Sequence, residues 1–222
     1  MSKLIIVPTP IGNLEDITLR SIRILRECDF ILAEDTRVTK KLLNHLEIVK
    51  PLQSFHIHNE HKLLNSLIHK IGQSNLTVLV SDAGTPGISD PGFLLVRACI
   101  ENQIEVECLP GPTAVIPALV VSGFPTDRFV FEGFLPQKKG RQTRIQEICK
   151  EERTVVLYES PHRILKFLNQ LKEYIQPNRP IAIIREISKF HEEILRGNID
   201  ELLEIVNSRE LKGEIVVVLS AL

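Results

Sequence analysis

The sequence predicts an α/β protein in which strands and helices alternate and the strands lie mostly parallel. Short β-branched and leucine-rich runs alternate with longer segments of helical apolar spacing along the whole chain. Several of the short runs end directly in a charged or Gly/Pro-rich loop. The 222 residues, 43% of them hydrophobic, are enough for one large domain or two small ones with a real core.

In the first half of the chain the strand-like runs are each followed by a loop and a helical segment. Asp16 opens a first helix, the Glu34-Asp35-Thr36-Arg37 motif a second, and Gly72 ends a third. A fourth is expected to start at Pro91 with Asp90 as its N-cap, and an apolar helix follows Thr113. The expected strands are 4–7, 30–33, 52–55, 76–80 and 106–109.

The second half shows the same alternation after Ser122-Gly123-Phe124-Pro125-Thr126, which we interpret as a linker. Strands are expected at 129–131, 154–158, 181–185 and 215–219, with residues 190–195 in an antiparallel pair. Helices are expected near 142–150, 161–174 and 199–206, the last capped by Asn198. The sequence therefore predicts two α/β domains, 1–121 and 122–222, that meet at a cleft.

The loop from Ser81 to Gly92 is the centre of this organisation. It follows a buried strand and is longer than a simple connection in an α/β unit needs. Its glycines permit close approach of backbone and its prolines stiffen it. Ligands of open α/β sheets bind beyond the carboxyl ends of the strands, so we expect this loop to contact one.

Composition limits the function classes. A net charge of −1 excludes capture of nucleic acid by overall charge, so a polyanion site must be a local patch. The four cysteines are far apart and form no Cys-x-x-Cys pair, which favours buried free thiols in a reducing compartment. The first apolar run is too short for a signal peptide, and no run could span a membrane. We expect a cytoplasmic protein.

Closely spaced histidines and a carboxylate occur in His56-x-His58-x-Glu60-His61. This pattern resembles the metal-binding signature of the metallo-β-lactamase hydrolases, which needs further histidines well downstream. No histidine lies between His69 and His162, so we expect no metal site. Glu60 and His58 are retained as candidate proton acceptors in a polar loop.

Three charged motifs have both a structural and a functional interpretation. The Glu34–Arg37 motif is a helix cap, or a substrate-facing carboxylate beside an arginine for phosphate. The cluster Lys138-Lys139-Gly140-Arg141, with Arg144, is a solvated helix start or a contact for an RNA backbone. In Tyr158-Glu159-Ser160-Pro161-His162-Arg163 a serine cap and a proline explain the helix start, but not the aromatic, histidine and arginine gathered there.

Several motifs together resemble one family. They are Pro8-Thr-Pro-Ile-Gly-Asn-Leu, Ala33-Glu-Asp-Thr-Arg, the Ser81–Gly92 loop, Leu109-Pro-Gly-Pro-Thr-Ala and Tyr158-Glu-Ser-Pro-His-Arg, in this order. The chain resembles the rRNA-methylating branch of the tetrapyrrole methylase superfamily from Lys3 to about Leu219. That fold is not of the Rossmann type, and no Gly-x-Gly-x-x-Gly follows the first strand.

The resemblance implies S-adenosylmethionine-dependent methylation of a cytidine ribose 2′-hydroxyl in 16S, small-subunit rRNA, free or in the assembled subunit. It also implies a homodimer and a cofactor held in the cleft between two α/β domains. The tetrapyrrole enzymes have a Gly-rich first loop where this chain has Pro8 to Asn13, so individual contacts can shift. Matched cofactor positions are Pro10, Gly12, Ser81, Asp82, Thr85, Gly111, Thr113, Ala114, Tyr158 and Gly213.

A ribose hydroxyl is a poor nucleophile, so a positioned base would help the transfer. The candidates are Asp35, Glu60 and His58, in that order. The candidate RNA contacts are Arg37, Lys138, Lys139, Arg141 and Arg163. Two alternatives stay open: a small-molecule methylase acting on a tetrapyrrole, and a non-catalytic RNA-binding assembly factor that keeps the methylase fold.

Overall fold

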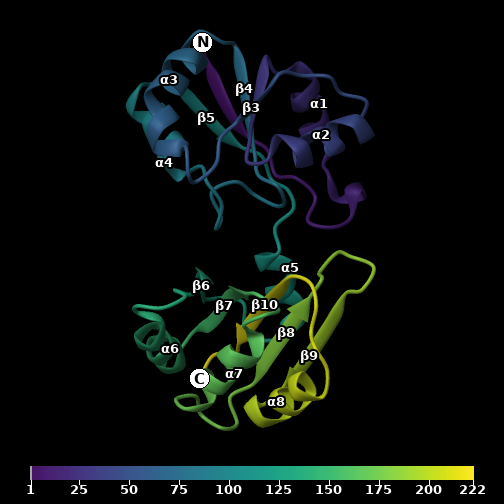
Figure 1. Ribbon diagram of the computed structural model, residues 1–222, viewed down its shortest axis with the longest axis vertical. Coiled ribbons are helices and arrows are strands. Elements are labelled where there is room, and N and C mark those ends of the chain that lie inside the picture. The colour runs from purple at the N-terminus through teal and green to yellow at the C-terminus, as the bar shows by residue number, and fades with distance from the viewer. Residues whose placement is uncertain (1) are drawn as a thin grey trace. The chain divides into compact units, whose positions relative to one another are not determined.

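The computed structural model describes residues 2–222, and the chain divides into two compact units after Thr113 (Figure 1). This division lies N-terminal to the boundary expected at residue 121. Helix α5 (Val115–Ser122) therefore belongs to the second unit, because its buried residues pack against the second sheet. The linker expected at 122–126 lies inside the second unit. The cofactor cleft implied by the resemblance stays a prediction.

The first unit is built on a parallel five-stranded sheet of order β3-β2-β4-β1-β5. Its strands are β1 (Lys3–Ile6), β2 (Phe30–Ala33), β3 (Leu52–Ser54), β4 (Leu76–Val80) and β5 (Glu105–Cys108). Every neighbouring pair is parallel, so the prediction of a parallel sheet is confirmed here. The carboxyl ends of all its strands consequently meet at one edge.

Helices cover both faces of this sheet (Figure 1). Helices α1 (Leu19–Glu27) and α2 (Thr36–His45) pack on the face that carries Ile5 and Val78. Helices α3 (Glu60–Gly72) and α4 (Phe93–Glu101) pack on the opposite face, which carries Leu4 and Leu79. Adjacent residues of a strand thus supply both cores, which is why these strands are apolar throughout.

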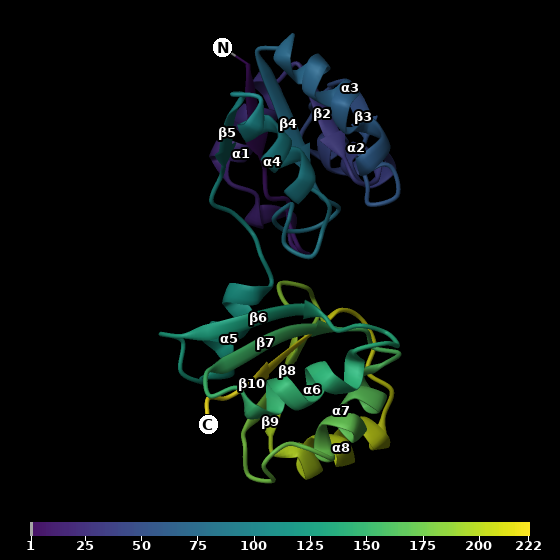
Figure 2. The same ribbon diagram turned by 90° about the vertical axis from the view of Figure 1, so that its left-hand side faces the viewer.

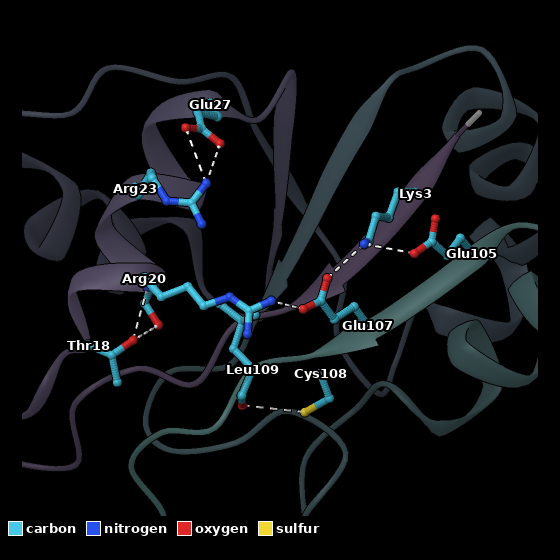
Figure 3. A network of polar contacts seen from close by, with 10 residues as sticks. Lys3, Thr18, Arg20, Arg23, Glu27, Glu105, Glu107, Cys108 and Leu109 are labelled. Carbon is cyan, nitrogen blue, oxygen red and sulfur yellow. Dashed lines mark hydrogen bonds and ion pairs between the residues drawn. The ribbon is translucent and has the colours of Figure 1, made fainter.

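Strand β5 is an edge of the first sheet and is charged (Figure 3). Lys3 on β1 bridges Glu105 at 2.8 Å and Glu107 at 2.7 Å, and Glu107 also pairs with Arg20 of α1. Charged side chains along an exposed edge oppose the addition of a further strand. They also make β5 less apolar than the central strands.

The second unit has a mixed sheet of order β6-β7-β10-β8-β9. Only β6 (Phe129–Phe134) and β7 (Thr154–Glu159) pair in parallel. Strand β10 (Ile215–Leu219) inserts antiparallel between β7 and β8 (Ile181–Arg185), and β8 forms an antiparallel hairpin with β9 (Glu193–Gly197). The expected antiparallel pair is thus present, but the mostly parallel arrangement is wrong for this half of the chain.

The two faces of the second sheet are covered unequally (Figure 2). Helices α6 (Arg141–Lys150), α7 (Ile164–Lys172) and α8 (Ile199–Ser208) pack on one face with a core that includes Phe167 and Val217. The short helix α5 packs on the other face against Val156 and Val218. Several side chains at the margins of that second face are consequently only partly buried.

Three expected helix caps have different outcomes. Asn198 caps α8 through a capping box with Glu201, as predicted. The cap expected at Asp90 is wrong, because the backbone turns at Gly92 with φ of 146° and α4 begins only after it. The cap expected at Ser160 is also wrong, because α7 starts at Ile164 with Arg163 as its N-cap; the Ser160 hydroxyl accepts the amide hydrogen of His162 in the turn before it.

Cys28, Cys99 and Cys149 are buried free thiols, as expected, and burial raises the pKa of each to about 11. Cys108 is exposed, because it lies at the end of the edge strand β5, so the expectation of a buried thiol is wrong there. Within residues 2–222, no helix is long and apolar enough to cross a membrane.

Arg179 is the most fully bonded cation of the second core, with 3% of the residue exposed. Its guanidinium donates to the carbonyl oxygens of Ser220 at 2.7 Å, Glu151 at 2.9 Å and both Ile148 and Cys149 at 3.1 Å. These carbonyls belong to the end of α6 and to the segment after β10, so one side chain joins three parts of the unit.

Replacing this guanidinium by an apolar side chain is expected to destabilise the second unit. Arg179→Met leaves buried carbonyls without donors, and we expect a loss of about 3–5 kcal/mol in the free energy of unfolding. Chemical denaturation measures it. Arg97→Met, at an exposed pair with Glu101, is the control and should lose less than about 0.5 kcal/mol. Equal losses in the two variants would contradict the assignment.

Candidate functional site

The carboxyl edge of the first sheet gathers the loops that the sequence analysis singled out. The loop after β1 holds Pro8 to Gly12, that after β2 holds Glu34 and Asp35, and that after β4 holds Ser81 to Gly92. The loop after β5 runs from Leu109 to Thr113. Because the strands are parallel and adjacent, these loops form a continuous rim.

Hydrogen bonds lock the loop after β1 to the loop after β4. Thr9 and Gly84 form an isolated antiparallel bridge in which each amide donates to the other's carbonyl at 2.9 Å. The Thr9 hydroxyl also donates to the carbonyl of Ser81 at 3.1 Å. Gly84 has φ of 81°, a conformation that favours glycine, so the residue type is set by the bridge.

The loop after β5 is joined to both of them. The Thr85 hydroxyl donates to the carbonyl of Pro112 at 3.0 Å. A side chain on Gly111 would lie 2.7 Å from Cβ of Pro8, so only glycine permits this approach. The predicted cofactor positions Ser81, Thr85 and Gly111 thus all build the rim, while Pro10 and Gly12 lie on it partly or fully exposed.

Two carboxylates tie the loops after β2 and β4 together reciprocally. The amide of Asp35 donates to Asp82 Oδ1 at 3.0 Å, and the amide of Asp82 donates to Glu34 Oε2 at 3.3 Å. Each side chain therefore holds the other loop's backbone. Burial raises the pKa of both Glu34 and Asp82 above the ordinary carboxyl range.

Asp35 has the opposite electrostatic character. Arg37 donates to it through Nη2 at 2.6 Å and through Nε at 3.0 Å, and the Arg37 amide donates at 2.8 Å. These bonds lower the pKa of Asp35 to about 2, which makes its carboxylate a weak proton acceptor. Asp35 is the N-cap of α2, so the structural interpretation of this motif is confirmed.

Glu34 was not among the candidate bases of the sequence analysis. Both are partly buried carboxylates in one short motif, and the difference lies in their partners: Arg37 bonds Asp35 and lowers its pKa, whereas desolvation raises the pKa of Glu34. Its position in the sequence also favours Glu34 over Asp35 as a base. Asp35 caps the helix α2, whereas Glu34 directly follows strand β2 and has no capping role.

The histidine loop follows β3 at the same edge. Nε2 of His56 lies within hydrogen-bond distance of Asn59 Nδ2, at 3.2 Å, and the His56 ring contacts that of His58 edge-on at 5.9 Å between centroids. The buried Nδ1 of His56 has no hydrogen-bond partner. His58 is exposed and Glu60 begins α3. Across residues 2–222, no three His, Cys, Asp or Glu side chains lie where they could hold a metal ion.

In the second unit the Tyr158–Arg163 motif is organised by Glu159, which has a fully buried carboxylate. Arg141 donates to it at 2.8 Å, Arg163 at 2.9 Å and the amide of Ser160 at 2.8 Å. Arg141 is itself 5% exposed and also bonds Gln170. Its expected contact with RNA is therefore not favoured, because the guanidinium is buried and its charge is neutralised.

The remaining predicted residues of this unit lie nearer its surface. Lys138 and Lys139 are exposed in the loop just before α6. Tyr158 is partly buried between the rings of Phe131 and Phe134, at 5.2 Å and 5.4 Å between centroids. At Gly213, φ is 88° and a Cβ would overlap the side chain of Glu186, so this glycine is required by packing.

Thr113 and Ala114 occupy the division between the units, where Ala114 precedes the first residue of α5. Both are partly buried. The sequence match to cofactor positions at these two residues stays a prediction.

Comparison with known proteins agrees with the motifs. Residues 3–203 match the family Tetrapyrrole (Corrin/Porphyrin) Methylases. A ribosomal RNA small subunit methyltransferase I of Thermotoga maritima is 48% identical over 220 residues, which are 99% of each chain. A protein of the same name from Hydrogenobaculum sp. is 50% identical, over 98% of this chain and 95% of its own. Another from Synechocystis sp. is 47% identical, over 99% of this chain and 79% of its own.

Solved structures agree in fold. A diphthine synthase superposes with a TM-score of 0.74 at 13% identity, over 99% of this chain and 90% of its own. A uroporphyrin-III C-methyltransferase of Thermus thermophilus, complexed with S-adenyl homocysteine, superposes with a TM-score of 0.68 at 19% identity, over 99% of this chain and 97% of its own. Taken with the rim of locked loops, these matches lead to one conclusion: the chain belongs to the tetrapyrrole methylase family and, within it, to the ribosomal RNA small subunit methyltransferases I.

Proposed function

We propose that this enzyme transfers a methyl group from S-adenosylmethionine to the ribose 2′-hydroxyl of a cytidine in 16S rRNA. Its relatives' name supports the small-subunit rRNA as substrate. The motifs that resemble the rRNA-methylating branch support the cytidine ribose as acceptor. The structural observation that carries the proposal is the locked rim of loops, in which the partly buried Glu34 and the exposed Asp82 join two loops.

The hydrogen-bond acceptors of the rim suit three groups of S-adenosylmethionine: its sulfonium, its ammonium and its ribose diol. The rim offers the acidic oxygens of Asp82 and Glu34 and a row of loop carbonyls, while its nearest cation, Arg37, is paired with Asp35. Such a set suits cations and hydroxyl donors. We propose that Asp82, Thr85, Gly111 and Thr113 bind the cofactor.

When bound, this cofactor supplies an already activated methyl group, so the chain needs to bind, align and deprotonate the acceptor. A rim fixed by hydrogen bonds can hold the reactants in line without reorganising. A general base works best with a pKa close to the working pH. Glu34 meets this condition better than Asp35, because burial raises the pKa of Glu34 and Arg37 lowers that of Asp35.

Glu34 is therefore the proposed proton acceptor for the ribose hydroxyl. Glu60 and His58 stay alternatives in the neighbouring loop. Arg37 is 87% exposed at its side chain and is proposed, with Lys138, Lys139 and the partly exposed Arg163, to contact RNA phosphates.

The proposal predicts where a labelled methyl group is deposited. Incubation with methyl-labelled S-adenosylmethionine and either free 16S rRNA or assembled small subunits should label one cytidine ribose, located by mass spectrometry of nuclease fragments. Label on a base would contradict the ribose assignment. Label on a tetrapyrrole alone would favour the small-molecule methylase, and cofactor binding without transfer would favour the assembly factor.

Paired variants separate the roles of the two carboxylates. Glu34→Gln keeps an oxygen for the Asp82 amide but removes the base, so we expect kcat to fall about 100-fold with cofactor affinity unchanged. Asp82→Asn also keeps an acceptor for the Asp35 amide, and should weaken cofactor binding about 10-fold because a charged acceptor is lost. Calorimetry and single-turnover kinetics measure these effects.

The pH dependence gives a further check on Glu34. Its carboxyl must be ionised to act, so activity should rise with pH through a pKa above the ordinary glutamate range. Glu34→Gln should remove that limb. Because the folded-state pKa is raised, ionisation of Glu34 also costs folding stability as pH rises through it, and the glutamine variant should lose this dependence. A rising limb unchanged in Glu34→Gln would exclude Glu34 as the base.

We also propose that the enzyme is a homodimer that acts in the cytoplasm, where its rRNA substrate is made. The resemblance supports the dimer, and the exposed apolar residues Ile116 and Val120 on α5 agree with it. Sedimentation velocity should give about twice the mass of one chain at micromolar concentration. Ile116→Glu, on an outward position of α5, should favour the monomer if this helix lies in the interface.

A further inference from the structure

Phe190 is the most exposed aromatic side chain of the described residues, at 96% of its maximal accessibility. It lies in the turn between β8 and β9, which projects from the second sheet as a hairpin (Figure 1). An aromatic ring exposed to water gains nothing for folding, since it buries no apolar surface. The sequence nonetheless places it in a turn that is fixed by many polar contacts.

The turn adopts a costly backbone conformation. Glu186 and Ser188 have φ of 52° and 65°, in the left-handed region that side-chain-bearing residues seldom adopt. No glycine is used at either position. Strain of this kind persists only where the surroundings enforce it, and it is concentrated at functional sites.

Polar contacts enforce this conformation. Lys189 Nζ lies between Glu186 Oε1 at 2.8 Å and Glu214 Oε2 at 2.9 Å. The amide of Ser188 donates to Glu192 Oε2 at 2.7 Å, and that of Lys189 donates to the carbonyl of Glu186 at 2.9 Å. The turn is therefore rigid, and the ring is presented in a fixed place.

The sheet register brings other aromatic and cationic groups to the same edge. At this edge Arg185 of β8 lies opposite Glu193 of β9 on one side and Ile215 of β10 on the other. Ile215 in turn lies opposite Glu159 of β7, and Tyr158 of β7 lies opposite Phe134 of β6. The hairpin turn, which joins β8 to β9, and the end of β6 thus flank one sheet edge, three to four interstrand spacings or about 14–19 Å apart. This edge also presents the 55% exposed ring of Phe134.

Lysines follow directly from that edge. Lys138 and Lys139 come after β6 and are exposed, and neither forms an ion pair within residues 2–222. Exposed rings beside unpaired cations are the combination with which proteins bind single-stranded RNA: the rings stack on bases and the cations contact phosphates.

We propose that Phe190 stacks on an unpaired base of the rRNA, so that the hairpin turn determines which single-stranded segment is positioned for methylation. This inference rests on the proposed function. An interface with protein fits less well, because protein interfaces have a contiguous apolar centre. The neighbours of Phe190 in the chain are Lys189, His191 and Glu192, and its ring lies T-shaped to that of His191 at 5.0 Å between centroids.

The sequence contains no tryptophan, so Phe190→Trp introduces a single fluorescent reporter at the turn. A base stacked on the indole should quench its emission when 16S rRNA is added. Phe129→Trp, at the opposite end of β6 where the residue is 36% exposed, is the matched control and should show little quenching. Both titrations use RNA transcript and a correction for its absorption.

A second set of variants measures the effect on binding and turnover. Phe190→Ala should weaken rRNA binding about 10-fold at every salt concentration, because stacking releases no counterions. It should raise KM for rRNA about as much, while leaving kcat at saturating RNA and the affinity for S-adenosylmethionine unchanged. Phe190→Trp should restore binding, and Lys138→Ala should instead reduce the salt dependence.

The outcomes separate this inference from the function on which it rests. If the unaltered enzyme methylates rRNA but Phe190→Ala has the same KM and the indole of Phe190→Trp is not quenched, the stacking role alone is excluded. If the emission of Phe190→Trp per molecule changes with protein concentration but not on addition of RNA, the turn is a protein contact and the inference is again overturned. If the unaltered enzyme neither binds nor methylates rRNA, the function and the inference fail together.

Discussion

The reciprocal bonding between the loops after β2 and β4 is the constraint on which the candidate active site depends. Each loop uses a carboxylate to hold the other's backbone amide, Asp82 for Asp35 and Glu34 for Asp82. The parallel pairing of β2 with β4 makes this possible, because it brings both strand ends to one level. Desolvation at this junction favours the protonated form of both carboxylates, of which Glu34 is partly buried and Asp82 exposed. The carboxylates of Glu34 and Asp82 therefore hold the loops together and are also the groups proposed to act on the reactants.

The second unit uses its buried charges differently. Glu159 is neutralised by Arg141 and Arg163, and Arg179 is surrounded by carbonyls, so these groups fix the strands and helix ends around them. A buried charge with complete partners has no capacity left for a ligand. In the proposed function, contacts with RNA therefore fall to the partly exposed Arg163 and to exposed groups at the sheet edge, the lysines before α6 and the rings of Phe134 and Phe190.

Two glycines have separate tasks in the rim of the first unit. Gly84 supplies a positive φ at the bridge with Thr9, while Gly111 supplies the space in which Pro8 packs. Alanine at Gly84 would be strained by the positive φ, and alanine at Gly111 would clash with Pro8. The stiff loops consequently keep one arrangement, as alignment of a methyl donor and an acceptor requires.

The sequence by itself determined the features that depend on neighbouring residues: the strands at 30–33, 76–80, 181–185 and 215–219, the caps by Asp35 and Asn198, and the motifs of the family. Periodicity and capping act over a few residues, so the sequence displays them. The tertiary structure alone decided which charges are buried. Arg141 meets Glu159 across 18 positions and Asp82 meets Asp35 across 47, and such pairings follow from strand order, which no local pattern contains. Strand β10 illustrates this best, since its insertion between β7 and β8 makes the second sheet mixed and brings Gly213 against Glu186.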